Sequence, residues 1–402
     1  MCNDSSCSLW SPAKSNYLPQ MADETLHLGN STCYNFTMSC RKWLLLSLLV
    51  GACNEAPETT IPPTQSSLPQ QVNFGVSIAG AEFGSDGLSF SNEQPGVLGE
   101  DYFHNKPWTF NWFQEEGVDL FRVPFRWERI QPQLNGPLDE TELMRLLKIA
   151  EWASKKNVRV IFDLHNFGRY SILHEGEIIS AVVDKKYNSQ VLVSSDNLID
   201  VWSKIIRACD TANVTPWALG LMNEPHDMGL GKWRKISRRL VLGIREMGSE
   251  HTLLVSGDGW SSAENWRKQH GAKTWIDDPL DNVLYEAHVY FDHDGAGKYG
   301  LSFGEELRRD PNMYERPRQR LQPFLEWLKK NNARGIIGEI GVPNSIKPWE
   351  RVVRKAMLLL QQHDVEMIYW AAGEWWGDYP MSIQPPSKSS LGSDLFRSLT
   401  AN

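Results

Sequence analysis

Hydrophobic and polar positions fall into two alternating patterns from Val72 onward. Short apolar runs bounded by turn-forming residues are typical of buried parallel strands. Between them lie longer segments whose apolar residues recur every three or four positions, as on the buried face of a helix. The strand-like runs lie at 74–79, 118–123, 158–164, 218–222, 252–256, 283–288, 335–339 and 366–370.

The helical segments carry start signals and buried stripes. Asp139 is a predicted N-cap, and Glu142 three residues later completes a capping box. Another segment places Cys209 on its apolar face, which predicts a core thiol, and Pro348 opens a further helix. The predicted buried positions are Leu143, Leu146, Leu147, Ala150, Leu198, Val201, Trp202, Ile205, Leu321, Phe324, Leu325, Leu328, Val352, Val353 and Ala356.

Strands that each precede a helix or a long loop predict an α/β fold, a (β/α)8 TIM barrel formed as a single domain over residues 72–402. A doubly wound sheet is the alternative, but the sequence shows no Gly-rich phosphate loop to favour it. In a TIM barrel the residues that end the strands gather at one rim. Polar side chains at the predicted strand ends are therefore candidates for function.

The residues before Val72 follow a different pattern. Arg41 and Lys42 precede a short apolar run at 43–50, as in a signal peptide. That run is too short for a bilayer, which needs roughly 20 residues. It ends in Val50-Gly51-Ala52-Cys53, which resembles the lipobox of bacterial lipoproteins and implies cleavage before Cys53 and a lipid on its sulfur. An ordinary secretory signal, with Cys53 incidental, is the alternative.

We expect translation to begin at Met38, so that residues 1–37 are an over-extended N-terminus and residues 38–52 the signal peptide. Residues 53–71, rich in Pro, Thr, Ser and Gln, are predicted to form a flexible tether. The expected location is the bacterial cell envelope, as a lipoprotein of the outer membrane or cell surface, or otherwise the secreted fraction.

The composition narrows the classes of partner. A formal net charge of -8 argues against nucleic acid. The 17 Trp residues favour flat, weakly polar ligands such as sugar rings, which stack on aromatic faces. Only Cys209 lies within the predicted domain, so that domain cannot contain an internal disulfide. The other cysteines are Cys2, Cys7, Cys33, Cys40 and Cys53.

Most predicted strands end in polar or aromatic residues. Glu224 and Glu339 each follow an apolar run, and two facing carboxyl groups are the minimum needed to cleave a glycosidic bond. A single strand-end residue is more often structural than catalytic, but a set that converges on one rim favours catalysis. The remaining strand-end residues are Arg122, His165, Asn166, Asn223, His288, Tyr290 and Trp370.

These residues belong to longer motifs: Phe121-Arg-Val-Pro-Phe125, Asp163-Leu-His-Asn166, Leu221-Met-Asn-Glu-Pro225, His288-Val-Tyr290 and Gly338-Glu339. Together they resemble glycoside hydrolase family 5, whose members are (β/α)8 retaining glycosidases, over residues 72–399. The segments 75–83, 125–129 and 375–379 look most like the family's microbial endo-β-1,4-glucanases. Glu374 departs from those relatives, where a small residue or proline is expected, and leaves the substrate detail open.

The resemblance implies a role for each acid in a double-displacement reaction on cellulose or a related β-glucan. Glu339 would be the nucleophile and Glu224 the acid/base. Arg122 beside Glu339 would keep that carboxyl ionised, since a nearby cation lowers a carboxyl pKa. Tyr290 could donate a hydrogen bond to the same group.

The resemblance also implies roles in sugar binding. Asn223 would bind the sugar 2-hydroxyl, and His165 and His288 would position the sugar and the acid. Trp370 would be the floor beneath the sugar next to the cleaved bond. The further substrate-binding candidates are Asn166, Trp127, Phe167, Trp260 and Trp376.

We expect no cofactor and no catalytic metal. Asp292-His-Asp-Gly295 begins like a calcium loop, but Phe303 stands where the closing Glu would be. The expected partner is a β-linked polysaccharide, with the membrane reached only through Cys53 and the protein acting as a monomer. The alternatives are the same mechanism on β-mannan, xyloglucan or mixed-linkage glucan, and a non-catalytic glycan-binding lipoprotein.

Overall fold

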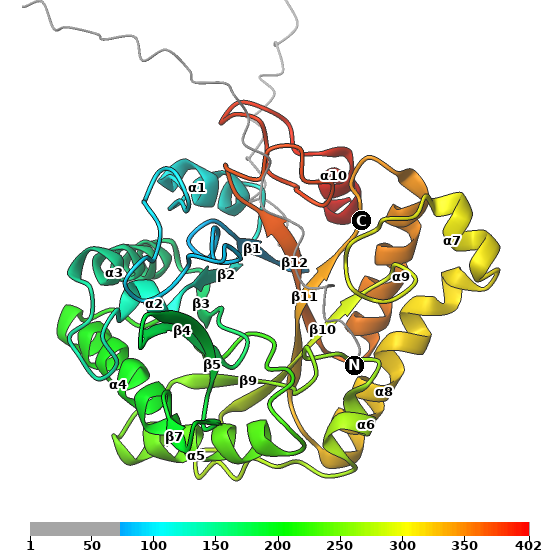
Figure 1. The fold of residues 1–402 in the computed structure, drawn as a ribbon. Coiled ribbons are helices and arrows are strands. Elements are labelled where there is room, and N and C mark those ends of the chain that lie inside the picture. The colour runs from blue at the N-terminus through cyan, green and yellow to red at the C-terminus, as the bar shows by residue number, and fades with distance from the viewer. Residues whose placement is uncertain (1–72, 402) are drawn as a thin grey trace, which may run out of the picture. The chain divides into compact units, whose positions relative to one another are not determined.

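The computed structural model describes residues 73–401, and within them eight parallel strands close into a barrel (Figure 1). Neighbouring strands follow the order β1-β12-β11-β10-β9-β8-β3-β2. The predicted TIM barrel is therefore confirmed. The barrel strands are β1 (Gly75–Ile78), β2 (Leu120–Phe125), β3 (Arg159–Leu164), β8 (Ala218–Gly220), β9 (Thr252–Ser256), β10 (Val283–Tyr290), β11 (Gly335–Gly341) and β12 (Glu366–Ala372).

Helices surround the barrel on its outside, with their apolar faces toward the strands (Figure 1). Almost all the predicted stripe positions are buried; Leu143 and Leu147 are half-buried. The helices are α1 (Pro107–Glu115), α2 (Trp127–Ile130), α3 (Glu140–Lys156), α4 (Ser195–Ala212), α5 (Lys232–Glu246), α6 (Trp266–His270), α7 (Phe303–Arg309), α8 (Arg316–Asn331), α9 (Lys347–Gln362) and α10 (Asp394–Thr400), with the 3₁₀ turn η1 (Met313–Glu315) before α8.

The N-terminus of α3 corrects one detail of the sequence analysis. Asp139 is the N-cap, since its carboxylate accepts from the backbone N–H groups of Thr141 and Glu142 at 2.9 Å each. The capping box is wrong, because the Glu142 carboxylate turns away to the Tyr102 hydroxyl and the His104 ring. The buried contacts of Glu142 with these two side chains are favoured over a hydrogen bond back to the N-cap backbone.

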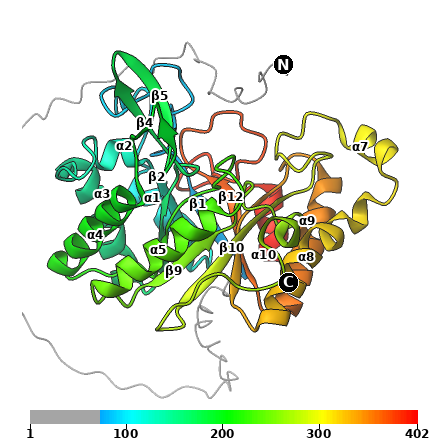
Figure 2. The same ribbon diagram turned by 60° about the horizontal axis from the view of Figure 1, so that its bottom comes forward.

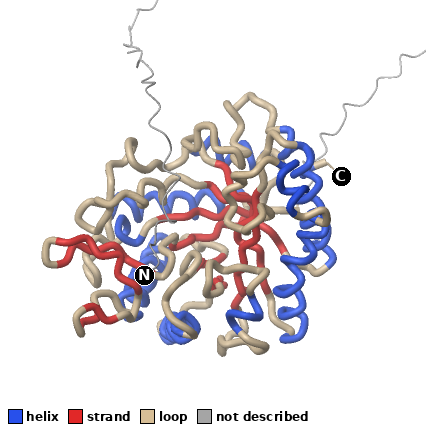
Figure 3. Tube along the Cα trace, turned by 45° about the vertical axis from the view of Figure 1, so that its right-hand side comes forward, coloured by secondary structure: helices blue, strands red, loops and turns tan. Residues whose placement is uncertain are grey.

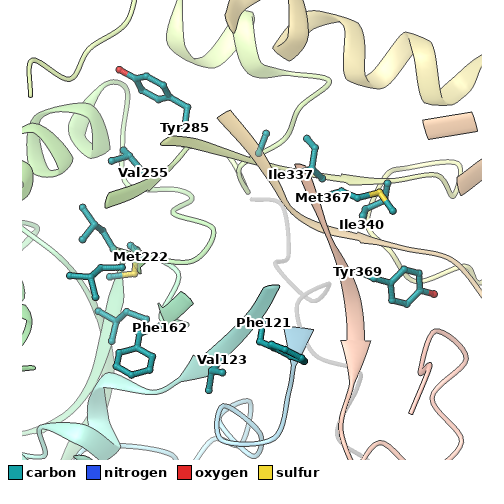
Figure 4. Close-up of a cluster of buried hydrophobic side chains, with 14 of the residues drawn as sticks. Phe121, Val123, Phe162, Met222, Val255, Tyr285, Ile337, Ile340, Met367 and Tyr369 are labelled. Carbon is teal, nitrogen blue, oxygen red and sulfur yellow. The ribbon is translucent and has the colours of Figure 1, made fainter. Parts of the chain in front are cut away.

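Successive side chains of a strand point to opposite faces of the sheet. One set packs between strands and helices and includes Phe121, Val123, Phe162, Ile337 and Tyr369 (Figure 4). The other set faces the barrel interior, where seven strands contribute one residue each to an apolar cluster: Leu120, Ile161, Ala218, Leu254, Leu284, Ile336 and Ile368. Two residues further along β2, β3 and β10 the same alternation places Arg122, Asp163 and Glu286. The barrel interior is thus apolar at one level and charged at the next.

A hairpin after β3 was not predicted. Strands β4 (Arg169–His174) and β5 (Glu177–Val182) pair antiparallel beside the barrel, with β6 (Lys186–Tyr187) and β7 (Gln190–Val191) following (Figures 2 and 3). Glu175 and Gly176 form the two-residue turn, both with positive φ. An acidic residue and a glycine between two apolar-polar alternations are the signal that could have revealed it.

Cys209 is buried on α4 and free, as predicted for a core thiol. In residues 73–401 no helix is long and apolar enough to cross a membrane. The predicted over-extended N-terminus, signal peptide, tether and lipidated Cys53 lie outside the described residues.

Candidate active site

Glu339 lies near the end of β11, and its carboxylate faces two hydrogen-bond donors. Arg122 on β2 donates from Nη1 to Oε1 at 3.0 Å, and the Tyr290 hydroxyl donates to Oε2 at 2.8 Å. Burial, and then the negative charge of Glu339, raise the pKa of Tyr290 well above its usual value, so Tyr290 stays a donor. A cation and a phenol therefore fix the orientation of this one carboxylate and place a positive charge beside it.

Glu224 follows β8 and holds a positive φ of 42°. A non-glycine residue keeps such a backbone only where its surroundings fix it, as at functional sites. Its Oε1 lies 2.7 Å from Nδ1 of His288. One oxygen of Glu224, one oxygen of Glu339 and a ring nitrogen of His288 all lie within 4.8 Å of one another. This closeness fits the carboxyl pair of a retaining glycosidase, roughly 5–5.5 Å apart, better than the ~6.5–9.5 Å of an inverting one.

His288 is surrounded by carboxylates. Nδ1 faces Glu224 and, at 3.6 Å, Glu339, while Nε2 lies 3.5 Å from Glu286. Burial alone would lower the pKa of His288, but the three carboxylates outweigh it and raise the pKa to about 10. An imidazolium therefore lies between the two candidate catalytic acids.

Arg122 connects Glu339 to the residue that precedes Glu224, and it has no exposed surface. Its second amino group donates to Asn223 Oδ1 at 2.6 Å and lies 3.2 Å from Asp163, and its Nε lies 3.4 Å from Glu286. Burial alone would lower the pKa of Arg122, but the surrounding carboxylates raise it above its usual value. Arg122 thus holds Glu339 and the residue before Glu224 in one frame.

His165 completes the frame on the β3 side. Its Nδ1 lies 2.8 Å from Asp163 Oδ2, and its Nε2 lies 3.3 Å from Nδ2 of Asn223. Because burial lowers the pKa of His165 well below its usual value, the ring is neutral. A proton on Nδ1 leaves Nε2 as the acceptor for the Asn223 amide, whose oxygen Arg122 occupies. Asn223 is fully buried in this arrangement, so its binding of a sugar 2-hydroxyl stays a prediction.

Trp370, at the end of β12, forms the aromatic wall next to the acids. Its ring stacks on His165 with centroids 5.5 Å apart and meets the edge of Trp376, which stacks on Tyr379 at 4.2 Å. Trp370 and Trp376 therefore lie together, and their contact with a sugar stays a prediction. Tyr379 was named in a motif without a role.

A second aromatic group lies beyond Glu224. Trp260 stacks on His226 at 3.4 Å, and Phe167 lies 6.1 Å from Trp260. Trp260 is 42% exposed and Phe167 half-buried, so both can offer an open face. Burial lowers the pKa of His226 to about 4, and the neutral ring donates from Nδ1 to the backbone oxygen of Glu224.

Two substrate-binding predictions are wrong. Trp127 has no exposed surface, packs on Tyr170 and donates from its indole to Gln131. Asn166 is also fully buried, with Oδ1 accepting from the Trp127 backbone and Nδ2 donating to Glu128. Both residues follow strands, but their side chains are part of the folded core.

Sequence reasoning missed two buried acids of the site. Asp163 was named only within a motif, without a role, and Glu286 was not considered. Glu286 stands two residues before His288 on β10, so strand alternation places both on the barrel interior. That spacing is the signal that could have identified it.

Glu374 has a structural explanation. Its carboxylate accepts from the Lys106 backbone N–H at 2.7 Å and the Thr109 hydroxyl at 3.0 Å, at the start of α1. Lys106 offers no side-chain cap there, so Glu374 supplies the acceptor that the helix N-terminus lacks. The carboxylate is therefore directed to α1.

Glu224, His288 and Glu339 could also be considered as a set of metal ligands by their spacing. His288 would have to be neutral and release its contact with Glu224 to bind a metal. The raised pKa of His288 makes the imidazolium the favoured form, so these three residues are better suited to sharing a proton than to binding a metal ion.

A family model described as cellulase (glycosyl hydrolase family 5) matches residues 76–375. Endo-beta-1,4-glucanase B of Emericella nidulans is 30% identical over 318 residues, 78% of this chain and 86% of that protein. The crystal structure of Pseudomonas stutzeri endoglucanase Cel5A in complex with cellobiose aligns with a TM-score of 0.67 at 31% identity, covering 82% of this chain and 92% of that one. XacCel5A in complex with cellopentaose aligns with a TM-score of 0.68 at 28% identity, covering 82% and 99%.

Proposed function

The chain belongs to the cellulases of glycosyl hydrolase family 5, and on this premise we propose that it is an endo-β-1,4-glucanase that acts with retention. The observation that carries the proposal is the pair Glu224 and Glu339, whose oxygens lie within 4.8 Å beside His288. Relatives named endo-β-1,4-glucanases and the neighbours that hold cellobiose and cellopentaose support a β-1,4-glucan as the substrate.

The reaction has two displacements. A Glu339 oxygen attacks the anomeric carbon, the bond to the leaving sugar breaks, and Glu224 gives its proton to the departing oxygen. Water then attacks the same carbon from the side that the leaving group vacated, Glu224 takes its proton, and the ester to Glu339 breaks. Each acid ends as it began, and the configuration is retained.

The supporting residues act through charge and placement. Arg122 and Tyr290 orient the Glu339 carboxylate for attack and stabilise it when it leaves. Trp370 supplies an apolar face on which a sugar ring can stack. Since all these groups come from one chain, a monomer suffices for the reaction.

We also propose that the enzyme is exported and held at the cell surface by a lipid on Cys53. The basic pair and the apolar run that ends at Cys53 support export and acylation. A polymeric glucan cannot enter a cell, so an enzyme that cleaves it must act outside.

Hydrolysis of a soluble cellulose derivative tests the proposed activity, with Glu339→Ala as the matched inactive variant. Proton NMR during the first turnovers of a short cello-oligosaccharide should show the β-anomer first. Absence of hydrolysis by the wild-type enzyme would leave only glycan binding, and an initial α-anomer would refute retention.

A further inference from the structure

A second set of charges lies inside the barrel beneath the two catalytic acids. It consists of Arg122, Asp163 and Glu286, each with no exposed surface. Arg122 has a role in holding Glu339, and Asp163 in orienting His165. Glu286 has no exposed surface through which to reach a substrate, so its burial as a charge needs an explanation.

Glu286 is held from one side and faces two cations on the other. Its Oε2 accepts from the Ser256 hydroxyl on β9 at 2.9 Å. Its Oε1 lies 3.4 Å from Arg122 Nε and 3.5 Å from His288 Nε2. These three atoms form no hydrogen bond within the described residues, so ion pairing with one another is their main interaction. Burial would raise the pKa of Glu286, but Arg122 and His288 lower it below its usual value, so it is ionised.

The residue before the nucleophile is shaped around Glu286. A β-carbon added to Gly338 would lie 2.0 Å from Oε1 of Glu286. Gly338 does not have the positive φ that demands glycine. The glycine is therefore required for space, and the space it leaves is filled by the Glu286 carboxylate.

The position of Glu286 bears on the proton of His288. A carboxylate accepts but does not donate, so Nε2 facing Glu286 carries a hydrogen. The tautomer of a histidine is set by the partner of its other nitrogen. With Nε2 protonated, the remaining proton lies in the 2.7 Å bond between Nδ1 and Glu224, on either atom.

We propose that Glu286 is a positioning residue for the acid/base step: it fixes one proton on Nε2 of His288, so that Nδ1 and Glu224 share a single exchangeable proton. With that proton on Glu224, the residue is the acid that the first displacement needs. With it on Nδ1, Glu224 is the base of the second. The inference rests on the proposed role of Glu224.

The charges around His288 give the direction of the expected pH effect. It faces Glu224 after β8, Glu339 on β11 and Glu286 on its own strand, while Arg122, Asp163 and His165 lie behind them. Removing the charge of Glu286 makes the site more positive, so the shared proton is lost at lower pH. The alkaline limb of the pH profile of kcat/KM reports the loss of the acid form, so it should move to lower pH.

Glu286→Gln keeps the shape and removes the charge. We expect its alkaline limb on cello-oligosaccharides to shift by about one pH unit, which is about tenfold lower kcat/KM above the limb. The matched control is Glu306→Gln, which removes the charge of another fully buried carboxylate. Glu306 lies on α7, outside the barrel, and pairs with Arg316 at 2.9 Å. It should leave both limbs in place. Equal profiles for Glu286→Gln and the wild type would refute the proposal.

A substrate with a good leaving group distinguishes an effect of Glu286 through His288 from one through Arg122. A dinitrophenyl cellobioside needs no acid in its first step, so Glu286→Gln should lose little of that step's rate. An equal loss of rate on the dinitrophenyl substrate and on cello-oligosaccharides would show that Glu286 acts through Arg122 on the nucleophile, and would contradict our proposal.

A direct measurement is made on the wild-type site and needs no Glu286 variant. In ¹⁵N-histidine-labelled wild-type enzyme, assigned with His288→Gln, the His288 signals should show Nε2 protonated throughout the active pH range. A neutral His288 with its proton on Nδ1 would overturn the inference. Because that result is independent of hydrolysis, it is distinguishable from failure of the proposed function.

Discussion

Arg122 donates to Glu339 across 3.0 Å from a position with no exposed surface. The same guanidinium donates to Asn223, the neighbour of Glu224, at 2.6 Å. One cation therefore sets the distance between the two halves of the site. Such a planar fork cannot be replaced by the single ammonium of lysine.

Arg122→Lys should therefore lower kcat by about 100-fold or more, because Glu339 or Asn223 loses its donor. The effect is read in steady-state kinetics on a soluble cellulose derivative. Arg316→Lys is the matched control, since Arg316 is similarly buried and ion-paired, with Glu306. It should cost stability without the loss of kcat, and a similar loss in both variants would contradict a specific role of Arg122.

The two tryptophans that sequence reasoning treated alike should respond differently. Trp127→Ala empties a fully buried position and should cost about 3–5 kcal/mol of unfolding free energy. Trp260→Ala removes a 42% exposed ring and should weaken substrate binding by about 1 kcal/mol with little effect on stability.

Trp217→Ala is the control for Trp260. Trp217 is half-buried but precedes β8, at the end of the barrel opposite the acids. Its loss should leave substrate affinity unchanged. Equal weakening by both substitutions would remove Trp260 from the substrate path.

The barrel and the two acids could be predicted because their signals are local. Each strand is a short apolar run, and Glu224 and Glu339 stand where such runs end. The distinction between Trp260 and Trp127 could not be made this way, because it depends on which loop covers a ring. Strand alternation from His288 points to Glu286, but that Asp163 and Glu286 both meet Arg122 depends on how β3 and β10 lie relative to β2 in the closed barrel. That placement is a long-range property that no single segment encodes.

Glu82 should make stability pH-dependent. Its carboxyl is buried, with one oxygen accepting from Gly80 at 2.8 Å and the other without a hydrogen-bond partner in the described residues. Burial raises its pKa from 4.5 to about 8. Because the unfolded chain ionises first, the stability that this group contributes is complete below pH 4.5 and is lost as pH rises to about 8.

Glu82→Gln removes that ionisation and keeps an oxygen for Gly80. Thermal or urea unfolding at pH 8 should show it more stable than wild type by about 2–4 kcal/mol, with a small difference at pH 4. A constant difference between the two proteins across this range would show that Glu82 is not the titrating group.

The proposed lipid anchor at Cys53 predicts where the protein is found. Expressed in a bacterial host, the full chain should fractionate with membranes, and Cys53→Ser should be released or retained as an unprocessed precursor. Cys209→Ser is the control, since that thiol is buried in α4 and cannot carry a lipid. The same distribution for wild type and Cys53→Ser would exclude acylation at Cys53.

The roles of the two acids can be read from rescue by azide. Glu224→Ala should still form the glycosyl-enzyme from a substrate with a good leaving group, because that step needs no proton. The intermediate should then accumulate, since water lacks its base, and azide should accelerate turnover and give the β-glycosyl azide.

Glu339→Ala cannot form the intermediate and should lose several orders of magnitude in kcat while still binding substrate. Azide can enter that cavity only from the face that the nucleophile occupied, so a β-linked substrate should give the α-glycosyl azide. Arg122 and Tyr290 converge on Glu339, and His288 lies 2.7 Å from Glu224, which supports this assignment over its reverse. An inverted azide product from Glu224→Ala would exchange the two roles.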